Sequence, residues 1–339
     1  MRNKLKNNVI VMIALSTGLF VSACNQTKKT ETTTETTDVI VTAATDADAH
    51  SGTHTYACPM HPEVTGKEGD MCPKCGMKLE HNDNAGKSNG KAYVMNFKAV
   101  PGSIEAGKAA VLSFTPGVKD KAAVRQSGEL VPLDLHHERK IHLIVVSKDL
   151  SYFEHIHPDY QPSGTYDVAV LPTGKNYTDG ANKNETRFAK GGDYILFADY
   201  APTGGNAQLE KINLTVGGTP YTPATYLASK LSSTVDSYTL DLVPEGGSFM
   251  VGKLAHIQGV LKKGGKEVDA ATLENYLGAK AHMVVIGVDD KNYLHVHPEV
   301  KDGKFDLHTT FEKAGVYRGW VQFQADGKVY TTDYVIVVK

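Results

Sequence analysis

Three cysteines and one histidine lie in two short motifs before residue 80. Cys58 and His61 form a C-x-x-H pair, and Cys72 and Cys75 form a C-x-x-C pair further along the chain. Each pair can close a tight turn, and four nitrogen and sulfur ligands from two such turns match tetrahedral metal coordination. Because thiolates dominate this set, the motif favours Zn(II) or Cu(I) over hard ions.

Two methionines, Met60 and Met77, accompany these pairs and offer thioethers, which suit Cu(I) better than zinc. The strings YACPMHP at 56–62 and GDMCPKCGMKL at 69–79 closely resemble the small heavy-metal-binding domain of copper efflux adaptors and copper-transporting P-type ATPases. This resemblance implies a soft-metal ligand set on the three cysteines and His61. A zinc ribbon that only holds a small domain together is the alternative, and a disulfide between the last two cysteines is another.

Six further histidines form two matching triplets, each made of one histidine in an apolar segment and a later His-x-His-Pro motif. Side chains alternate along a strand, so both histidines of the motif share one face. A hairpin loop at 148–151, or at 288–291, sets the first histidine opposite the last, about 4.5–5.5 Å away. Three imidazoles on one patch can bind Cu(II) or Zn(II). The triplets are His142, His155 and His157, and His282, His295 and His297.

These histidines could instead be hydrogen-bonded core residues that a shared ancestor preserved in both copies. Four others, His136, His137, His256 and His308, have no match between the copies, so we expect them to be surface or packing residues. No nucleophile or acid–base motif accompanies the triplets. Neither copy has a cysteine for a blue-copper site, and we therefore expect no enzyme.

The segments around the triplets repeat along the chain, which predicts two homologous domains to position them. A drop in the offset between copies places an insertion in the first copy, within 171–186. The matching segments are 93–97 with 238–242, 140–142 with 280–282, 155–158 with 295–298, and 188–194 with 311–317.

Both copies consist of short β-branched segments punctuated by Gly, Asp and Lys, without helical periodicity. The predicted fold class is mainly β: a small Cys/His metal-knuckle module followed by two homologous immunoglobulin- or cupredoxin-like β-sandwich domains. A Gly-x-Tyr before a late strand in each copy resembles a tyrosine corner. The expected parts are a lipoprotein signal peptide at 1–23, a flexible tether at 24–54, the heavy-metal-binding module at 55–81, a linker at 82–90, the first sandwich at 91–217, a linker at 218–235, and the second sandwich at 236–339.

Export is indicated by the first residues, where a basic segment precedes an apolar run. The sequence VSAC at 21–24 resembles a bacterial lipobox, which implies cleavage before Cys24 and a lipid on its sulfur. An ordinary signal peptide with a chance cysteine, or an uncleaved anchor, is the alternative. The Thr- and Asp-rich stretch that follows has too few large apolar residues to fold. We therefore expect a membrane-anchored lipoprotein on the periplasmic or cell-surface side.

The composition argues against a nucleic-acid-binding protein and against a disulfide-stabilised scaffold. The net charge of −2 gives no basic surface for nucleic acid, and 4 cysteines are too few for a disulfide scaffold. We expect a copper-binding protein for sequestration, hand-off or resistance, with Cu(I) at the cysteine module and Cu(II) at the histidines, or zinc. A copper efflux or transport system is the candidate partner. The alternatives are an interaction scaffold with a structural zinc module and a His-liganded metalloenzyme.

Replacing Cys24 with Ser tests the anchor. Because serine has no thiol to lipidate, we expect the variant to leave the membrane fraction or to retain its leader. Fractionation and the mass of the mature chain measure both outcomes. A variant that is processed and fractionates like the parent contradicts the lipobox assignment.

Overall fold

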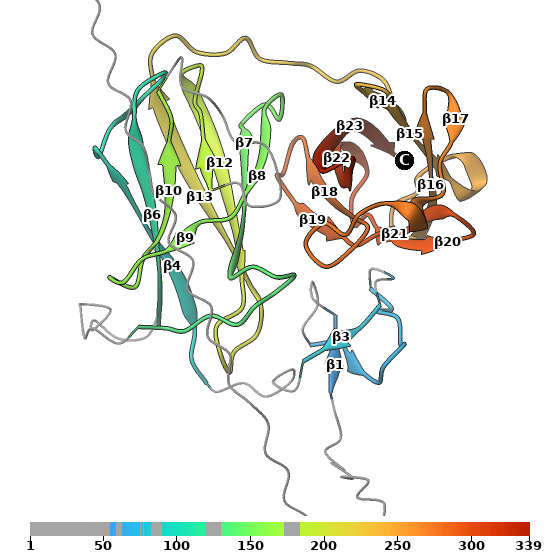
Figure 1. Cartoon of the computed structure of the whole chain (residues 1–339), viewed down its shortest axis with the longest axis horizontal. Coiled ribbons are helices and arrows are strands. Elements are labelled where there is room, and N and C mark those ends of the chain that lie inside the picture. The colour runs from blue at the N-terminus through green and yellow to red at the C-terminus, as the bar shows by residue number, and fades with distance from the viewer. Residues whose placement is uncertain are drawn as a thin grey trace, which may run out of the picture. The chain divides into compact units, whose positions relative to one another are not determined.

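The computed structural model describes residues 55–58, 63–74, 76, 78–82, 90–118, 130–172 and 184–339 (Figure 1). It confirms the predicted fold class, because the regular secondary structure of the described residues is almost entirely β-strand, in sandwich-like sheets. Within these ranges, no helix is long and apolar enough to cross a membrane. The expected leader and tether lie outside the described residues, as do the site candidates Cys24, Met60, His61, Cys75 and Met77.

The heavy-metal-binding module contains a small sheet, in which β1 (Tyr56–Ala57) lies between β2 (Thr65–Gly66) and β3 (Glu80–His81). Cys58 and Cys72 are buried beside Leu79. The turn after Cys72 is closed by the Gly76 amide, which donates to the Cys72 carbonyl at 2.7 Å. Gly76 has φ 73°, a left-handed conformation that glycine adopts without steric cost.

The first sandwich encloses a core to which both of its sheets contribute, for example through Leu112, Leu143 and Leu196. One sheet has the order β11 (Glu185–Thr186), β10 (Tyr166–Val170), β6 (Ala110–Val118) and β4 (Tyr93–Val100), with β9 (Asp159–Tyr160) beside β10. The other has the order β5 (Ile104–Glu105), β13 (Gln208–Gly217), β12 (Gly192–Tyr200), β7 (Ile141–Ser147) and β8 (Phe153–Ile156).

The second sandwich is built in the same way, around core residues such as Leu240, Met283 and Phe323. One sheet has the order β14 (Ser232–Val235), β15 (Tyr238–Pro244), β16 (Leu254–Lys263), β21 (Lys304–Thr310) and β20 (Glu299–Lys301), with β17 (Lys266–Glu267) beside β16. The other has the order β19 (Tyr293–Val296), β18 (Ala281–Gly287), β22 (Gly315–Ala325) and β23 (Lys328–Val338). Short 3-10 turns lie at η1 (Glu245–Gly247) and η2 (Ala270–Thr272).

A tyrosine-corner hydrogen bond occurs in each sandwich. The Tyr194 hydroxyl donates to the Lys190 carbonyl, and the Tyr317 hydroxyl donates to the Lys313 carbonyl, both at 2.9 Å. A hydroxyl that bonds to the backbone a few residues upstream is the feature that defines this corner in immunoglobulin-like sandwiches. The Gly-x-Tyr pattern therefore predicted a contact that the fold contains.

The strands β7 and β18 are buried on both faces along their whole length. In β7, Leu143 and Val145 face the core of their own sandwich, whereas Ile144 and Val146 join a separate apolar cluster. This cluster also contains residues of the second sandwich, so the two sandwiches bury the outer faces of these sheets against one another. We call it the interface cluster; its members are Ile144, Val146, Leu150, Ile195, Phe197, Val284, Ile286, Tyr293 and Trp320.

Two aromatic stacks cross the interface cluster in a reciprocal way. Phe153 on β8 stacks on Trp320 on β22 with ring centroids 4.5 Å apart, and Tyr293 on β19 stacks on Phe197 on β12 at 5.1 Å. Phe153 and Tyr293 occupy matching positions of the sequence repeat, as do Phe197 and Trp320. Each stack is thus the counterpart of the other, and the interface resembles that of a two-fold symmetric dimer within one chain.

Replacing Trp320 with Ala tests this interface. Trp320 is only 4% exposed, so we expect the free energy of unfolding to fall by about 3–5 kcal/mol. Chemical denaturation followed by circular dichroism measures the loss. Leu227, which is 93% exposed, provides the control, because Leu227→Ala should change stability by less than about 0.5 kcal/mol. Equal stability of the two variants contradicts the packing described here.

Candidate metal centre

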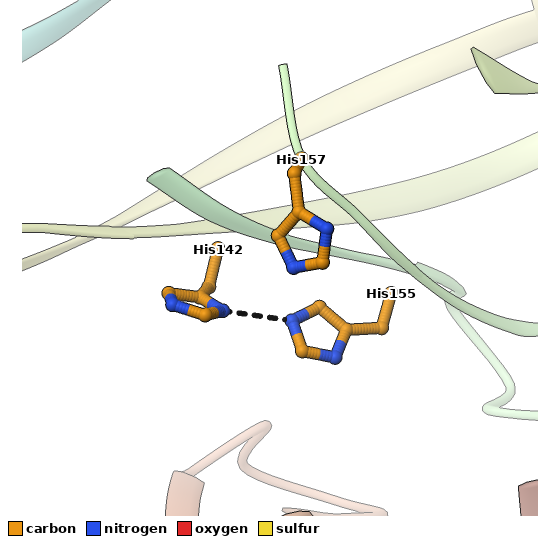
Figure 2. A group of neighbouring side chains, drawn as sticks. All are labelled: His142, His155 and His157. Atoms are coloured by element: carbon orange, nitrogen blue, oxygen red, sulfur yellow. Dashed lines mark hydrogen bonds between the residues drawn. The ribbon is translucent and has the colours of Figure 1, made fainter. Parts of the chain in front are cut away.

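The hairpins β7–β8 and β18–β19 bring the histidines of each triplet together. The first ladder pairs Leu143 with Ile156, and one further step sets His142 opposite His157. The second hairpin has the same register, which is the one expected from the loop positions. In each triplet one ring nitrogen from every histidine lies within 4.8 Å of the other two (Figure 2 shows the first triplet).

Outer hydrogen bonds fix the tautomers of the first triplet. His142 Nε2 donates to the His136 carbonyl, and His155 Nδ1 donates to Gln322 Oε1, both at 2.8 Å. The amide of Gln322 is oriented by its own Nε2, which donates to Thr331 Oγ1 at 3.0 Å. A neutral imidazole has a single N–H, so the opposite nitrogen of each ring presents a lone pair.

Those two lone pairs face each other. His142 Nδ1 lies 3.0 Å from His155 Nε2, the contact drawn as a dashed line in Figure 2. A proton could join them only if one ring were charged. Burial, together with His155 and His157, holds the pKa of His142 well below its ordinary value. A metal ion between the two rings would satisfy both nitrogens.

The second triplet has the same arrangement. His282 Nε2 donates to the Tyr276 carbonyl at 2.9 Å, and His295 Nδ1 forms a long hydrogen bond of 3.4 Å to Asp199 Oδ2. The other nitrogens of both rings, His282 Nδ1 and His295 Nε2, are buried without a hydrogen-bond partner among the described residues. Burial again lowers the pKa of both imidazoles. Both rings are therefore neutral, the form that binds metal.

The acceptors of the middle histidines are exchanged between the sandwiches. Asp199 lies on β12 next to His142, yet it accepts from His295 of the second sandwich. Gln322 lies on β22 next to His282, yet it contacts His155 of the first. Metal-bound histidines usually donate their second N–H to a carboxylate or a carbonyl. The residues present therefore fit a metal ion at each triplet.

The two acceptors differ in charge. Burial raises the pKa of Asp199, but its hydrogen bond to His295 and the charges of nearby histidines together outweigh burial, and the pKa lies below its ordinary value. Asp199 is thus a carboxylate at neutral pH, whereas Gln322 is a neutral amide. The middle histidine thus has an anionic hydrogen-bond acceptor in the second triplet and a neutral one in the first.

His136 and His137 were expected to be surface or packing residues, but both lie beside the triplets. The His137 ring centroid is 4.0 Å from that of His297 and 5.5 Å from that of His282. The sequence repeat gave no reason to expect a site there, because the matching positions of the second copy are Tyr276 and the following leucine. Their adjacency to each other, shortly before His142, was the available signal. The other unmatched pair consists of opposed residues of β16 and β21, outside both triplets.

Glu80 is a further residue that sequence reasoning missed. Its Oε1 lies 3.4 Å from His297 Nδ1 and 3.5 Å from His137 Nε2. Burial raises the pKa of Glu80, but the contact with His297 and the charges of His136 and His295 together outweigh burial and lower the pKa overall. Nothing in the local sequence marked this glutamate among the chain's acidic residues.

The cysteine ligand set is described only in part. Cys58 and Cys72 are buried in the apolar centre of the module. His61, Cys75 and the two methionines lie outside the described residues. The tetrahedral set therefore stays a prediction.

These features define a class: a β-sandwich protein with a buried histidine-rich centre and an N-terminal heavy-metal-binding module. The family model described as "Heavy metal binding domain" matches residues 55–82 and confirms the resemblance of that module. A second model, "Domain of unknown function (DUF8832)", matches residues 92–218 and 233–339. Because these ranges make up most of the sequence, the chain belongs to this family. No curated protein matches the sequence.

Several solved structures show a distant likeness. The Escherichia coli adhesin FdeC is 13% identical over 73% of this chain, with a TM-score of 0.22. Mutant Salmonella alpha-2-macroglobulin is 11% identical over 73%, with a TM-score of 0.21, and Bacteroides ovatus SGBP-B is 14% identical over 70%, with a TM-score of 0.17. The matches span 66%, 14% and 42% of those chains, respectively. TM-scores this low support no argument about function.

Replacing Asp199 with Asn tests the exchanged acceptors. Loss of the anionic partner of His295 should weaken metal binding at the second triplet by about 10–100-fold. Competition against a chelator measures the affinity for Cu(II) or Zn(II). Asp193, exposed on the same strand, provides the matched control, and Asp193→Asn should leave the affinity unchanged. Unchanged affinity in Asp199→Asn contradicts a role for this carboxylate.

Proposed function

We propose that this chain is an exported, lipid-anchored protein that binds copper outside the cytoplasm for sequestration, hand-off or resistance. The observation that carries the proposal is the pair of buried histidine triplets, in which one ring nitrogen of each histidine lies within 4.8 Å of the other two. The heavy-metal-binding module gives independent support for a metal-related function.

Copper is favoured over zinc by the chemistry of both ligand sets. Imidazole nitrogen binds divalent first-row metals in an order that peaks at Cu(II), so a site of three imidazoles binds Cu(II) more tightly than Zn(II). The cysteine module offers thiolates with two methionines beside them, which suit Cu(I). One chain would thus have separate sites for the two oxidation states.

Storage or hand-off is favoured over catalysis by burial. His142, His155, His157, His282 and His295 are all buried. An ion held there is shielded from water and from substrates of any size. Such shielding suits a protein that retains copper and keeps it from reacting.

The leader and lipobox support a place on the periplasmic or cell-surface side of a membrane, with Cys24 as the anchor. The long polar stretch after Cys24 would let the folded parts reach a partner in the same membrane. A copper efflux or transport system is the partner that the module's resemblance favours.

Copper counting tests this function. In a variant with Ser at all four cysteine positions, no thiol can reduce the metal, and we expect at least about two tightly bound equivalents of Cu(II). Changing His142 and His155 together to Ala should remove one equivalent, and changing His282 and His295 together should remove another. Metal analysis after gel filtration gives the counts. The only tryptophan, Trp320, lies two residues from Gln322 on β22, so its fluorescence should fall as copper binds.

The pair His256 and His308 provides the control for non-specific binding by histidine. These residues lie opposite each other on β16 and β21 with ring centroids 4.5 Å apart, and neither belongs to a triplet. Changing both to Ala should remove no copper. Copper counts that are the same in all the variants contradict metal binding by the triplets.

A further inference from the structure

Three parts of the chain converge on one carboxylate. Glu80 comes from β3 of the heavy-metal-binding module, His137 from the turn before β7, and His297 from the end of the β18–β19 hairpin. One ligand atom from each lies within 4.8 Å of the other two. The module and both sandwiches belong to one compact unit, Gly52–Lys339.

The two distances from Glu80 are close to those between ligands of one ion. Glu80 Oε1 lies 3.4 Å from His297 Nδ1 and 3.5 Å from His137 Nε2. Oxygen and nitrogen ligands about 2.0–2.2 Å from a tetrahedral ion lie about 3.3–3.6 Å from one another. A well-formed N–H···O hydrogen bond is shorter, about 2.7–3.2 Å. The separations of 3.4 and 3.5 Å fall within the range for a shared metal, and they are long for a direct hydrogen bond, like that of His295 to Asp199.

His297 connects this group to the second triplet. Its Nδ1 faces Glu80, whereas its Nε2 is buried with no hydrogen-bond partner in the part of the chain that the structure describes. The ring therefore offers one nitrogen to each side. When both nitrogens bind metal, the ring is an imidazolate, and its remaining N–H proton passes to solvent.

Exposure increases from the triplets toward Glu80. The side chains of His137 and His297 are 13% and 15% exposed, and that of Glu80 is 39% exposed. His282 and His295 lie deeper, at 1% and 2%. A metal that reaches the second triplet past His297 would meet Glu80 first.

We propose that Glu80, His137 and His297 form a third metal site, which takes a divalent ion such as Zn(II) or Cu(II) and joins the heavy-metal-binding module to the histidine triplets. A carboxylate with two imidazoles suits such ions, whereas thiolate sites suit Cu(I). The third site takes Glu80 from the module and shares His297 with the second triplet. It deepens the proposed function, on which it rests.

Zinc counting on the full chain tests the third site, because Zn(II) does not oxidise the module's thiols. The parent should retain about four equivalents after gel filtration: one in the module, one in each triplet and one at the third site. Glu80→Gln and His137→Asn should each retain about three. Asparagine suits position 137, where φ is 46°, because it tolerates the left-handed conformation.

The double variant decides whether the two residues share a site. Glu80→Gln with His137→Asn should still retain about three equivalents, because both changes empty the same site. Glu63, an exposed glutamate of the module paired with Lys74, provides the matched control, and Glu63→Gln should retain about four. A double variant that loses two equivalents, or a Glu80→Gln variant that loses none, overturns the third site while the triplets stand. A parent that binds only one equivalent overturns the triplets and the third site together.

Discussion

The reciprocal packing of the two histidine-bearing sheets is the constraint on which the metal centre depends. The stack of Phe197 on Tyr293 fixes β12 against the second sandwich. Because side chains alternate along a strand, Asp199 lies two residues further on the same face and meets His295. On β22, Trp320 stacks on Phe153 of the first sandwich, and Gln322, two residues further on the same face, meets His155. Apolar contacts at the interface thus set which nitrogen of each middle histidine is protonated.

Burial of the imidazoles has a cost in folding free energy, and it also keeps the rings in the neutral form that binds metal. A buried polar group without a partner costs about 1–3 kcal/mol, and in the second triplet His282 Nδ1 and His295 Nε2 are buried without a hydrogen-bond partner among the described residues. The outer acceptors satisfy one nitrogen of a ring and orient the other, and burial keeps His142 and His282 neutral. An ion that supplies the missing partner binds the native state only, so its binding free energy adds to the stability of the fold. Stability and metal affinity are linked through the same few imidazoles.

The local sequence pattern predicted the strands, the sandwiches and the register of both hairpins. Side chains alternate along a strand, and with a fixed loop length only one pairing of the two strands remains. It did not predict that the sandwiches pack on each other, although the unbroken apolar run of β7 is typical of a strand covered on both faces. Asp199 and Gln322 carry no motif, since their role exists only across the interface. Glu80 and His137 were missed for the same reason: they meet only after three separate parts of the chain have folded together.

The two copies differ at the residues that set the charge beside each histidine triplet and at those that lie between the triplets and the module. The acceptor of the middle histidine is a carboxylate for the second triplet and an amide for the first, so a dication at the second triplet is partly neutralised by Asp199. His136 and His137 occur only in the first copy, yet His137 lies nearest His297 of the second. The second triplet, whose acceptor is the carboxylate of Asp199, is therefore also the one next to Glu80 and the module. Under the proposed function, an ion from the module reaches the more negative site first, and the neutral triplet fills at higher metal concentration. Duplication supplies the common hairpin, and under the proposed function divergence at its outer contacts would give the two sites different affinities.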